Sequence, residues 1–151
     1  MLILGLDPSL HKTGWCTIQK NSTIHSYGTF TVSSKFTGME AMQEMFKKSI
    51  KGLPKAGLLV CEVQQYRHGH GEKMTIENLL NLHAMCCALF LSLDIKNKIA
   101  CTPQRWKGTL PKKIQHARLC EKYNCLKTAT SDEKDAAGIA LWGLNEYNRR
   151  R

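Results

Sequence analysis

The sequence has no hydrophobic run long enough to cross a membrane. A transmembrane helix needs about 18 unbroken apolar residues, and the longest candidate, at 84–93, is much shorter and is followed by Asp94. The chain also does not start with a basic segment and an apolar stretch, as a secretory signal does. We therefore expect a cytoplasmic protein with no membrane partner.

The sequence also lacks paired cysteines. Its seven cysteines are an odd number, and no two of them are spaced as C-x-x-C. This argues against a disulfide framework and against a structural zinc site, and it is typical of a reducing compartment. The segment YRHGHGEK at 66–73 lacks the Gly-Lys-Ser/Thr ending of a phosphate-binding loop, so we expect no nucleotide cofactor.

Acidic residues are scarce relative to basic ones. Lysine and arginine total 22 against 12 aspartates and glutamates, which gives a net charge of +10 and a pI near 9.4. The excess is concentrated in the last third, where residues 101–151 contain eleven basic and five acidic side chains. Such a surplus favours a polyanionic partner, because each neutralised phosphate releases condensed counterions.

The hydrophobic pattern predicts five strands and four main helices. We expect strands at 2–6, 14–19, 23–32, 58–61 and 98–101, helices at 38–50, 74–93 and 111–123, a loop or short broken helix at 102–111, and a last helix capped by Ser131. Three strands in a meander followed by alternating helices and strands predict an α/β fold with a mixed sheet flanked by helices. The length fits a single domain spanning residues 1–151.

Two acidic residues stand at the ends of apolar strands. Asp7 follows the first strand, and Glu62 follows the strand at 58–61. If these strands are parallel neighbours, both carboxylates lie at the edge of the sheet where α/β folds usually bind ligands. Each has an ordinary alternative, since Asp7 before Pro8 could start a turn and Glu62 could be a surface acid.

Asp132 and Asp135 are three residues apart in the last predicted helix, so they share one face. Asp132 alone could be a charge at the helix N-terminus, whereas Asp135 precedes two alanines and is expected to face inward. Four carboxylates in one place repel one another unless a cation neutralises them, and oxygen ligands suit Mg²⁺ or Mn²⁺. Two such ions about 4 Å apart can activate water and stabilise the leaving oxygen of a phosphodiester. An acidic cluster in a basic chain therefore predicts a metal-dependent nuclease.

Four segments resemble motifs of the RuvC-type Holliday junction resolvases, which belong to the ribonuclease H-like superfamily. LGLDPSLHKTGW resembles the first-strand motif, LLVCEVQQY at 58–66 the second acidic strand, RWKGTLPKK the basic turn, and SDEKDAAGIALW at 131–142 the closing helix. The order of the segments matches along almost the whole chain. The sequence lacks the glycine-rich turn that bacterial members have after the first aspartate, and it looks more like a phage or divergent member, which would act in the cytosol of a bacterial host.

The resemblance implies a ribonuclease H-like fold with a five-stranded mixed sheet. It also implies a homodimeric, magnesium-dependent endodeoxyribonuclease that nicks two strands of a four-way DNA junction symmetrically. Asp7, Glu62, Asp132 and Asp135 match the acids that hold the metal, with two Mg²⁺ ions per site and Mn²⁺ as a substitute. The expected catalytic set also includes two lysines near DNA, Lys107 and Lys112, for which Lys113 is an equally good register.

Further residues are predicted to contact branched DNA. Tyr66 falls one residue from an aromatic position that inserts at the junction in bacterial members, and Arg67 and Lys73 follow in a loop that either contacts DNA or is merely solvated. Arg105 and Lys107 flank a tryptophan that either packs in the core or binds nucleic acid.

The sequence leaves alternative functions open. The chain could be a related nuclease that acts on flaps, forks or RNA–DNA hybrids, a non-catalytic junction-binding protein, or an actin-like nucleotide binder, although the second phosphate loop of that class is missing. The helix at 74–93 has apolar residues that either form a dimer interface or belong to the core: Leu79, Leu82, His83, Cys86 and Phe90.

Overall fold

The protein has a five-stranded mixed sheet in the order β3-β2-β1-β4-β5. The structure is a computed structural model that describes residues 1–64 and 75–150. Its strands are β1 (Leu2–Asp7), β2 (Lys12–Gln19), β3 (Ile24–Thr31), β4 (Leu58–Glu62) and β5 (Asn97–Cys101). The first three form an antiparallel meander, and β4 and β5 run parallel to β1. The five strands and the mixed sheet predicted from the sequence are confirmed.

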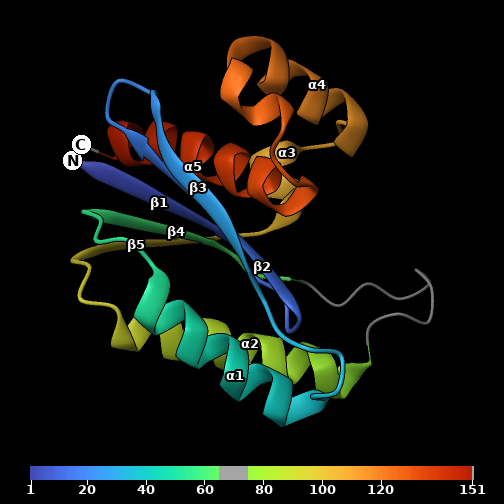
Figure 1. The fold of residues 1–151 in the computed structure, drawn as a ribbon. Helices are drawn as coiled ribbons and strands as arrows, with labels where there is room; N and C mark the ends of the chain where they lie inside the picture. The colour runs from blue at the N-terminus through green and yellow to red at the C-terminus, as the bar shows by residue number, and fades with distance from the viewer. Residues whose placement is uncertain (65–74, 151) are drawn as a thin grey trace.

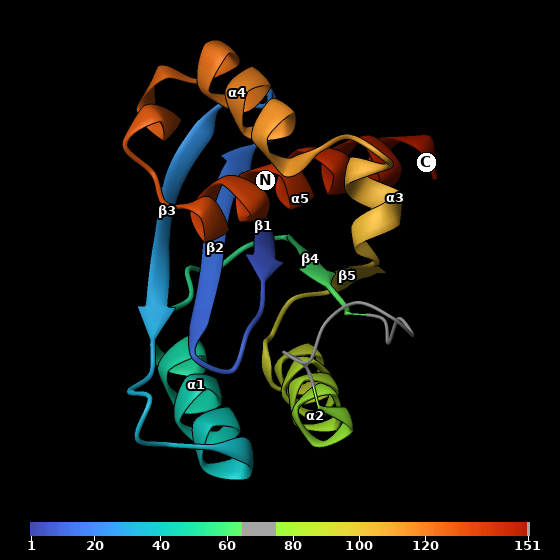
Figure 2. The ribbon, with the colours of Figure 1, turned by 90° about the vertical axis from the view of Figure 1, so that its right-hand side faces the viewer.

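Helices cover both faces of the sheet (Figure 1). On one face lie α1 (Gly38–Gly52) and α2 (Ile76–Ser92), and on the other lies α5 (Ser131–Arg149). Figure 2 shows α3 (Pro103–Lys107) and α4 (Lys112–Lys122) on the same side as α5. The segment predicted as a loop or short broken helix at 102–111 contains α3. A 3₁₀ helix, Asn124–Lys127, was not predicted.

Successive side chains along each strand point to opposite faces of the sheet, so the apolar residues are divided between two cores. In β1, Ile3 faces α5, while Leu4 and Leu6 face α1 and α2. In β4, Val60 faces α5 and its neighbour Cys61 faces the other core. The central strands are therefore buried on both faces, as their near-continuous apolar sequences predict.

Helix caps explain where the two site-forming helices begin. The Thr75 hydroxyl accepts a hydrogen bond from the Asn78 N–H at 3.1 Å, so Thr75 is the N-cap of α2. The prediction that Ser131 caps the last helix is wrong by one residue, because Thr130 is the N-cap of α5. Thr130 and Glu133 form a reciprocal capping box, which places both side chains on orphan backbone N–H groups.

All seven cysteines are free thiols, and four of them, Cys16, Cys61, Cys86 and Cys101, are buried. Burial raises the pKa of Cys16 and of Cys101 to about 12, so these side chains behave as small hydrophobes. Within residues 1–64 and 75–150, no helix has the length and apolar character that crossing a membrane requires.

Candidate active site

Asp7 and Glu62 lie side by side at the ends of two parallel strands. The register pairs Leu6 of β1 with Cys61 of β4, so each acid is the next residue along its strand. Both side chains are on the face covered by α5, because Asp7 has the same parity as Ile3 and Glu62 the same parity as Val60. The expectation that these two strands are parallel neighbours is confirmed.

Two glycines let the start of α5 approach this pair. A Cβ atom on Gly14, which is paired with Asp7 across the β1–β2 ladder, would lie 2.3 Å from the carbonyl oxygen of Asp132. A Cβ atom on Gly5 would lie 2.2 Å from the carbonyl oxygen of Ala136. The absence of these atoms lets the helix that carries Asp132 and Asp135 rest directly on the strands.

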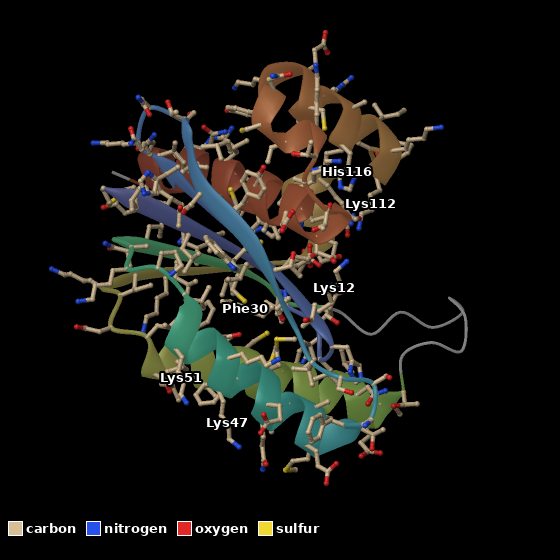
Figure 3. The ribbon with its side chains drawn as sticks, viewed as in Figure 1. Lys12, Phe30, Lys47, Lys51, Lys112 and His116 are labelled. Atoms are coloured by element: carbon tan, nitrogen blue, oxygen red, sulfur yellow. The ribbon has the colours of Figure 1, made fainter. Side chains whose placement is uncertain are left out.

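The two aspartates of α5 each have a cationic partner. Figure 3 labels the basic residues that contact them: Lys12, Lys112 and His116. Lys12 at the start of β2 places its Nζ 3.0 Å from Asp132 Oδ2. Asp135 is 5% exposed, and it receives Lys112 Nζ at 2.5 Å on Oδ2 and His116 Nε2 at 2.7 Å on Oδ1. Partial burial works against the charge of Lys112, but the hydrogen bond and negative charge of Asp135 outweigh it and raise the pKa of that lysine.

Glu62 is held by neutral donors. The indole N–H of Trp106 donates to Oε2, and the Gln64 side-chain amide donates to Oε1. Burial raises the pKa of Glu62 above its ordinary value, and the Trp106 hydrogen bond and the charge of Lys107 oppose that rise. The carboxylate is 3% exposed, so its orientation is set by these contacts and not by solvent.

The four carboxylates interact electrostatically. Burial raises the pKa of Asp7 well above its ordinary value, and the charges of Glu62, Asp135 and Asp132 raise it further, while Lys112 opposes them. Among the described residues, no cation lies within ion-pair distance of Asp7. The cluster therefore has an excess of negative charge at its centre.

The arrangement is not a preformed cage. Within the described ranges, no three histidine, cysteine, aspartate or glutamate side chains are already grouped as the ligands of one metal ion. Three of the acids instead have partners in the protein: Asp132 contacts Lys12, Asp135 contacts Lys112, and Glu62 accepts from Trp106. A cleft of about 250 Å³ opens beside Asp7 between the β1–β2 turn and α2.

The structure brings only some of the predicted basic residues to the acids. Lys112 contacts Asp135, and Lys107 lies with its Nζ 5.3 Å from the Trp106 ring centroid, near Glu62. Lys113 is exposed on α4. Arg105 points elsewhere, because its guanidinium stacks on Trp142 at 5.4 Å and lies 3.8 Å from Glu146. Three predicted DNA contacts fall outside the described residues: Tyr66, Arg67 and Lys73.

Two residues of the site, Lys12 and His116, are not predicted from the sequence, nor is the contact that Trp106 makes with Glu62. His116 is four residues after Lys112, so helical spacing alone could have placed both on one face of α4. Lys12 shares the parity of Gly14 on β2, which could have placed it on the α5 face. The sequence allows Trp106 either a core position or a role in nucleic-acid binding, and the structure buries it in the core that includes α5.

Among comparisons with known proteins, the one with solved structures supports the fold. No family model matches the sequence, and no curated protein matches it. The structure of T. thermophilus RuvC in complex with a Holliday junction substrate is similar with a TM-score of 0.72 and 18% identity, over 99% of this chain and 96% of that one. The Thermus thermophilus RuvC structure on its own gives a TM-score of 0.69, again with 18% identity and the same coverage of both chains.

A Fowlpox virus resolvase in complex with Holliday junction DNA gives a TM-score of 0.59 with 10% identity, over 97% of this chain and 99% of that one. RuvC and a poxvirus resolvase are the kind of neighbours that the sequence resemblance predicts. The ribonuclease H-like fold predicted from the sequence is confirmed by these likenesses and by the strand order.

Proposed function

We propose that this protein is a structure-selective endodeoxyribonuclease that resolves four-way DNA junctions by metal-dependent phosphodiester hydrolysis with symmetric paired nicks. The observation that carries the proposal is the meeting of Asp7, Glu62, Asp132 and Asp135 at one edge of the sheet in a chain of net charge +10. The same fold is found in two resolvases that were solved with Holliday junction DNA, which supports branched DNA as the substrate.

The acidic cluster fits divalent cations. Its donors are carboxylate oxygens, which suit Mg²⁺ and Mn²⁺, and the repulsion that raises the pKa of Asp7 is what a cation would relieve. Asp7, Glu62, Asp132 and Asp135 are the residues that would hold two Mg²⁺ ions, with Mn²⁺ as a substitute. Bound cations would polarise the phosphate and lower the pKa of the attacking water.

Lysines would hold the DNA backbone at the scissile bond. The Lys112 side chain is 47% exposed although its ammonium touches Asp135, so the same group can reach a phosphate oxygen. Lys107 lies beside Glu62, and Lys113 is exposed next to Lys112. Cations placed there stabilise charge that develops on the phosphate during cleavage, and they make binding dependent on salt.

Symmetric nicking requires two active sites, and we propose that α2 supplies the dimer interface. Three of the residues that the sequence offers for this interface are buried within the protein itself: Leu79, Leu82 and Cys86. The outward face of α2 carries a different apolar stripe at helical spacing: Ile76, Leu80, Ala84, Cys87 and Leu91. Leu91 is 86% exposed, and helices that are apolar all round are normally covered on every side.

The proposed function is tested with a labelled four-way junction. Each strand is labelled in turn, and the protein is incubated with and without Mg²⁺, beside matched flap, fork and RNA–DNA substrates. We expect paired nicks at symmetry-related positions of the junction, dependent on Mg²⁺ or Mn²⁺, and slower cleavage of the other substrates. The matched control is Asp7→Asn, which keeps the shape of the side chain but removes its charge.

Three results would contradict the proposal. Binding of the junction without any cleavage under Mg²⁺ or Mn²⁺ would indicate a non-catalytic junction-binding protein. Equal or faster cleavage of flaps, forks or hybrids would indicate a broader nuclease. Cleavage by Asp7→Asn at the wild-type rate would exclude the acidic cluster as the catalytic site.

A further inference from the structure

Trp106 lies between Glu62 and helix α5. Its side chain is 8% exposed and belongs to the core formed by the sheet and α5. Its indole N–H donates to Oε2 of Glu62, which is itself 3% exposed. A tryptophan buried in this core therefore contacts one of the four acids of the candidate site with its single polar atom.

The position of the indole ring is fixed by its surroundings. Gly138 on α5 leaves the space that the ring fills, because a Cβ atom there would lie 2.6 Å from the ring. The backbone N–H of Trp106 bonds to the carbonyl of Thr102, and Lys107 lies over the ring, with its Nζ 5.3 Å from the centroid. The ring is packed against α5 in a buried position, so its indole N–H is held toward Glu62 by the core.

The Glu62 carboxylate depends on such a donor. A glutamate side chain has three rotatable bonds, and a buried carboxylate without hydrogen bonds is costly. Its other oxygen, Oε1, bonds to the amide of Gln64, a residue of intermediate burial that belongs to neither hydrophobic core. Trp106 is therefore the contact to Glu62 that comes from a packed core position.

We propose that Trp106 is a positioning residue that, through its indole N–H, holds the Glu62 carboxylate in the orientation that binds the catalytic cation. The inference rests on the proposed function, because it assumes that Glu62 is a cation ligand. Partners that orient a ligand in this way typically contribute 10- to 100-fold in metal affinity or activity. Trp106 also links Glu62 on β4 to the helix that carries Asp132 and Asp135.

The test separates the N–H group from the packing of the ring. Trp106→Phe removes the N–H and part of the ring, and replacement of Trp106 by 3-benzothienylalanine keeps the indole shape but puts sulfur in place of N–H. The matched control is Trp142→Phe, because Trp142 stacks on Arg105 and, among the described residues, Trp106 is the tryptophan that donates to one of the four acids. Mn²⁺ affinity is measured by calorimetry on the free protein, and single-turnover nicking is measured as a function of Mg²⁺ concentration.

We expect both Trp106 variants to bind Mn²⁺ about 10- to 100-fold more weakly than wild type, and Trp142→Phe to stay within about twofold. Nicking by the Trp106 variants should approach the wild-type rate at high Mg²⁺, which a folding defect would not allow. In a Glu62→Ala background, which has no side-chain acceptor for the indole, the loss of the N–H should have no further effect on Mn²⁺ affinity, because the two residues act through one bond.

The outcomes distinguish the two proposals. If wild type binds Mn²⁺ and nicks junctions but the 3-benzothienylalanine protein has the same affinity, the role of Trp106 is refuted and the proposed function stands. If the loss in the Trp106 variants is equally large at every Mg²⁺ concentration, Trp106 is only structural, which also refutes the inference. If wild type binds no Mn²⁺, the metal-dependent function fails and the inference fails with it.

Discussion

Gly14→Ala is the substitution that most directly tests how α5 is placed at the site. Gly14 is paired with Asp7, and an added Cβ atom would lie 2.3 Å from the carbonyl oxygen and 2.4 Å from the carbonyl carbon of Asp132, where ordinary contacts are 3.4–4 Å. Both neighbouring atoms are backbone atoms, so no side chain can rotate to make room. The start of α5 must move by about 1 Å away from the strands to relieve the overlap.

The substitution is expected to slow nicking while the protein still folds. Misplacing a reacting group by about 1 Å costs roughly 100-fold in rate, and both Asp132 and Asp135 move with the helix. Forcing an extra carbon into a packed interior costs about 1–3 kcal/mol. For a chain of this size each kcal/mol lowers the melting temperature by about 2–4 °C. We therefore expect a folded protein that nicks junctions about 100-fold more slowly.

Gly57→Ala is the control at the opposite end of the sheet. Its Cβ atom would lie 2.6 Å from Cγ of Met1, which is also closer than an ordinary contact. Gly57 precedes β4 and Met1 precedes β1, so this overlap is at the strand ends opposite Asp7 and Glu62. Single-turnover nicking at saturating Mg²⁺ is measured below both melting temperatures, which are determined by circular dichroism. The reasoning is refuted if the two variants are folded and lose the same fraction of the wild-type rate.

Three further predictions concern charge and assembly. Because its pKa is raised in the fold, ionised Asp7 destabilises the cation-free protein above that pKa, and the penalty disappears as the pH falls below the unfolded value. Asp7→Asn should thus abolish nicking and leave junction binding intact. It should also raise the melting temperature at pH 7.5 without cations by a few degrees, as measured by scanning fluorimetry. An unchanged or lower melting temperature would contradict the expected destabilisation by ionised Asp7. Lys112→Gln should slow single-turnover nicking about 100-fold with a much smaller loss of junction affinity in gel shifts. Leu80→Glu combined with Leu91→Glu should give a monomer in analytical ultracentrifugation that converts a cruciform plasmid to nicked circles and not to linear DNA.

The position of the first acid pair could be predicted from the sequence because it depends on local pattern. An apolar run that ends at Asp7 and another that ends at Glu62 predict two buried strands, and buried strands of this kind are usually parallel neighbours. Because side chains alternate between the two faces of a strand, the position of each acid along its strand then decides on which face of the sheet it lies. The inward direction of Asp135 followed in the same way from the two alanines after it, and the structure buries that side chain.

The partners of the acids could not be predicted because they depend on how closely separate elements approach. In the sequence, Gly5 and Gly14 are ordinary strand glycines, and their role becomes visible only when α5 packs against them. The hydrogen bond from Trp106 to Glu62 likewise requires the space that Gly138 leaves on another helix. A single sequence contains no information on such pairs, since each member has a plausible role alone. What the sequence does not show is therefore which residues of separate elements contact each other.

The outward face of α2 shows the same limit from another direction. Leu79 and Leu80 are neighbours of the same residue type, yet the first is 8% and the second 63% exposed. When apolar residues occur on every side of a helix, periodicity cannot say which of them face the protein's own core. Only the packing of α2 against α1 and the sheet separates the two sets, and it leaves the set at Ile76, Leu80 and Leu91 for a partner. We therefore assign an apolar residue of α2 to the proposed interface when its side chain is exposed in the fold. The combined Leu80→Glu and Leu91→Glu substitutions test this assignment.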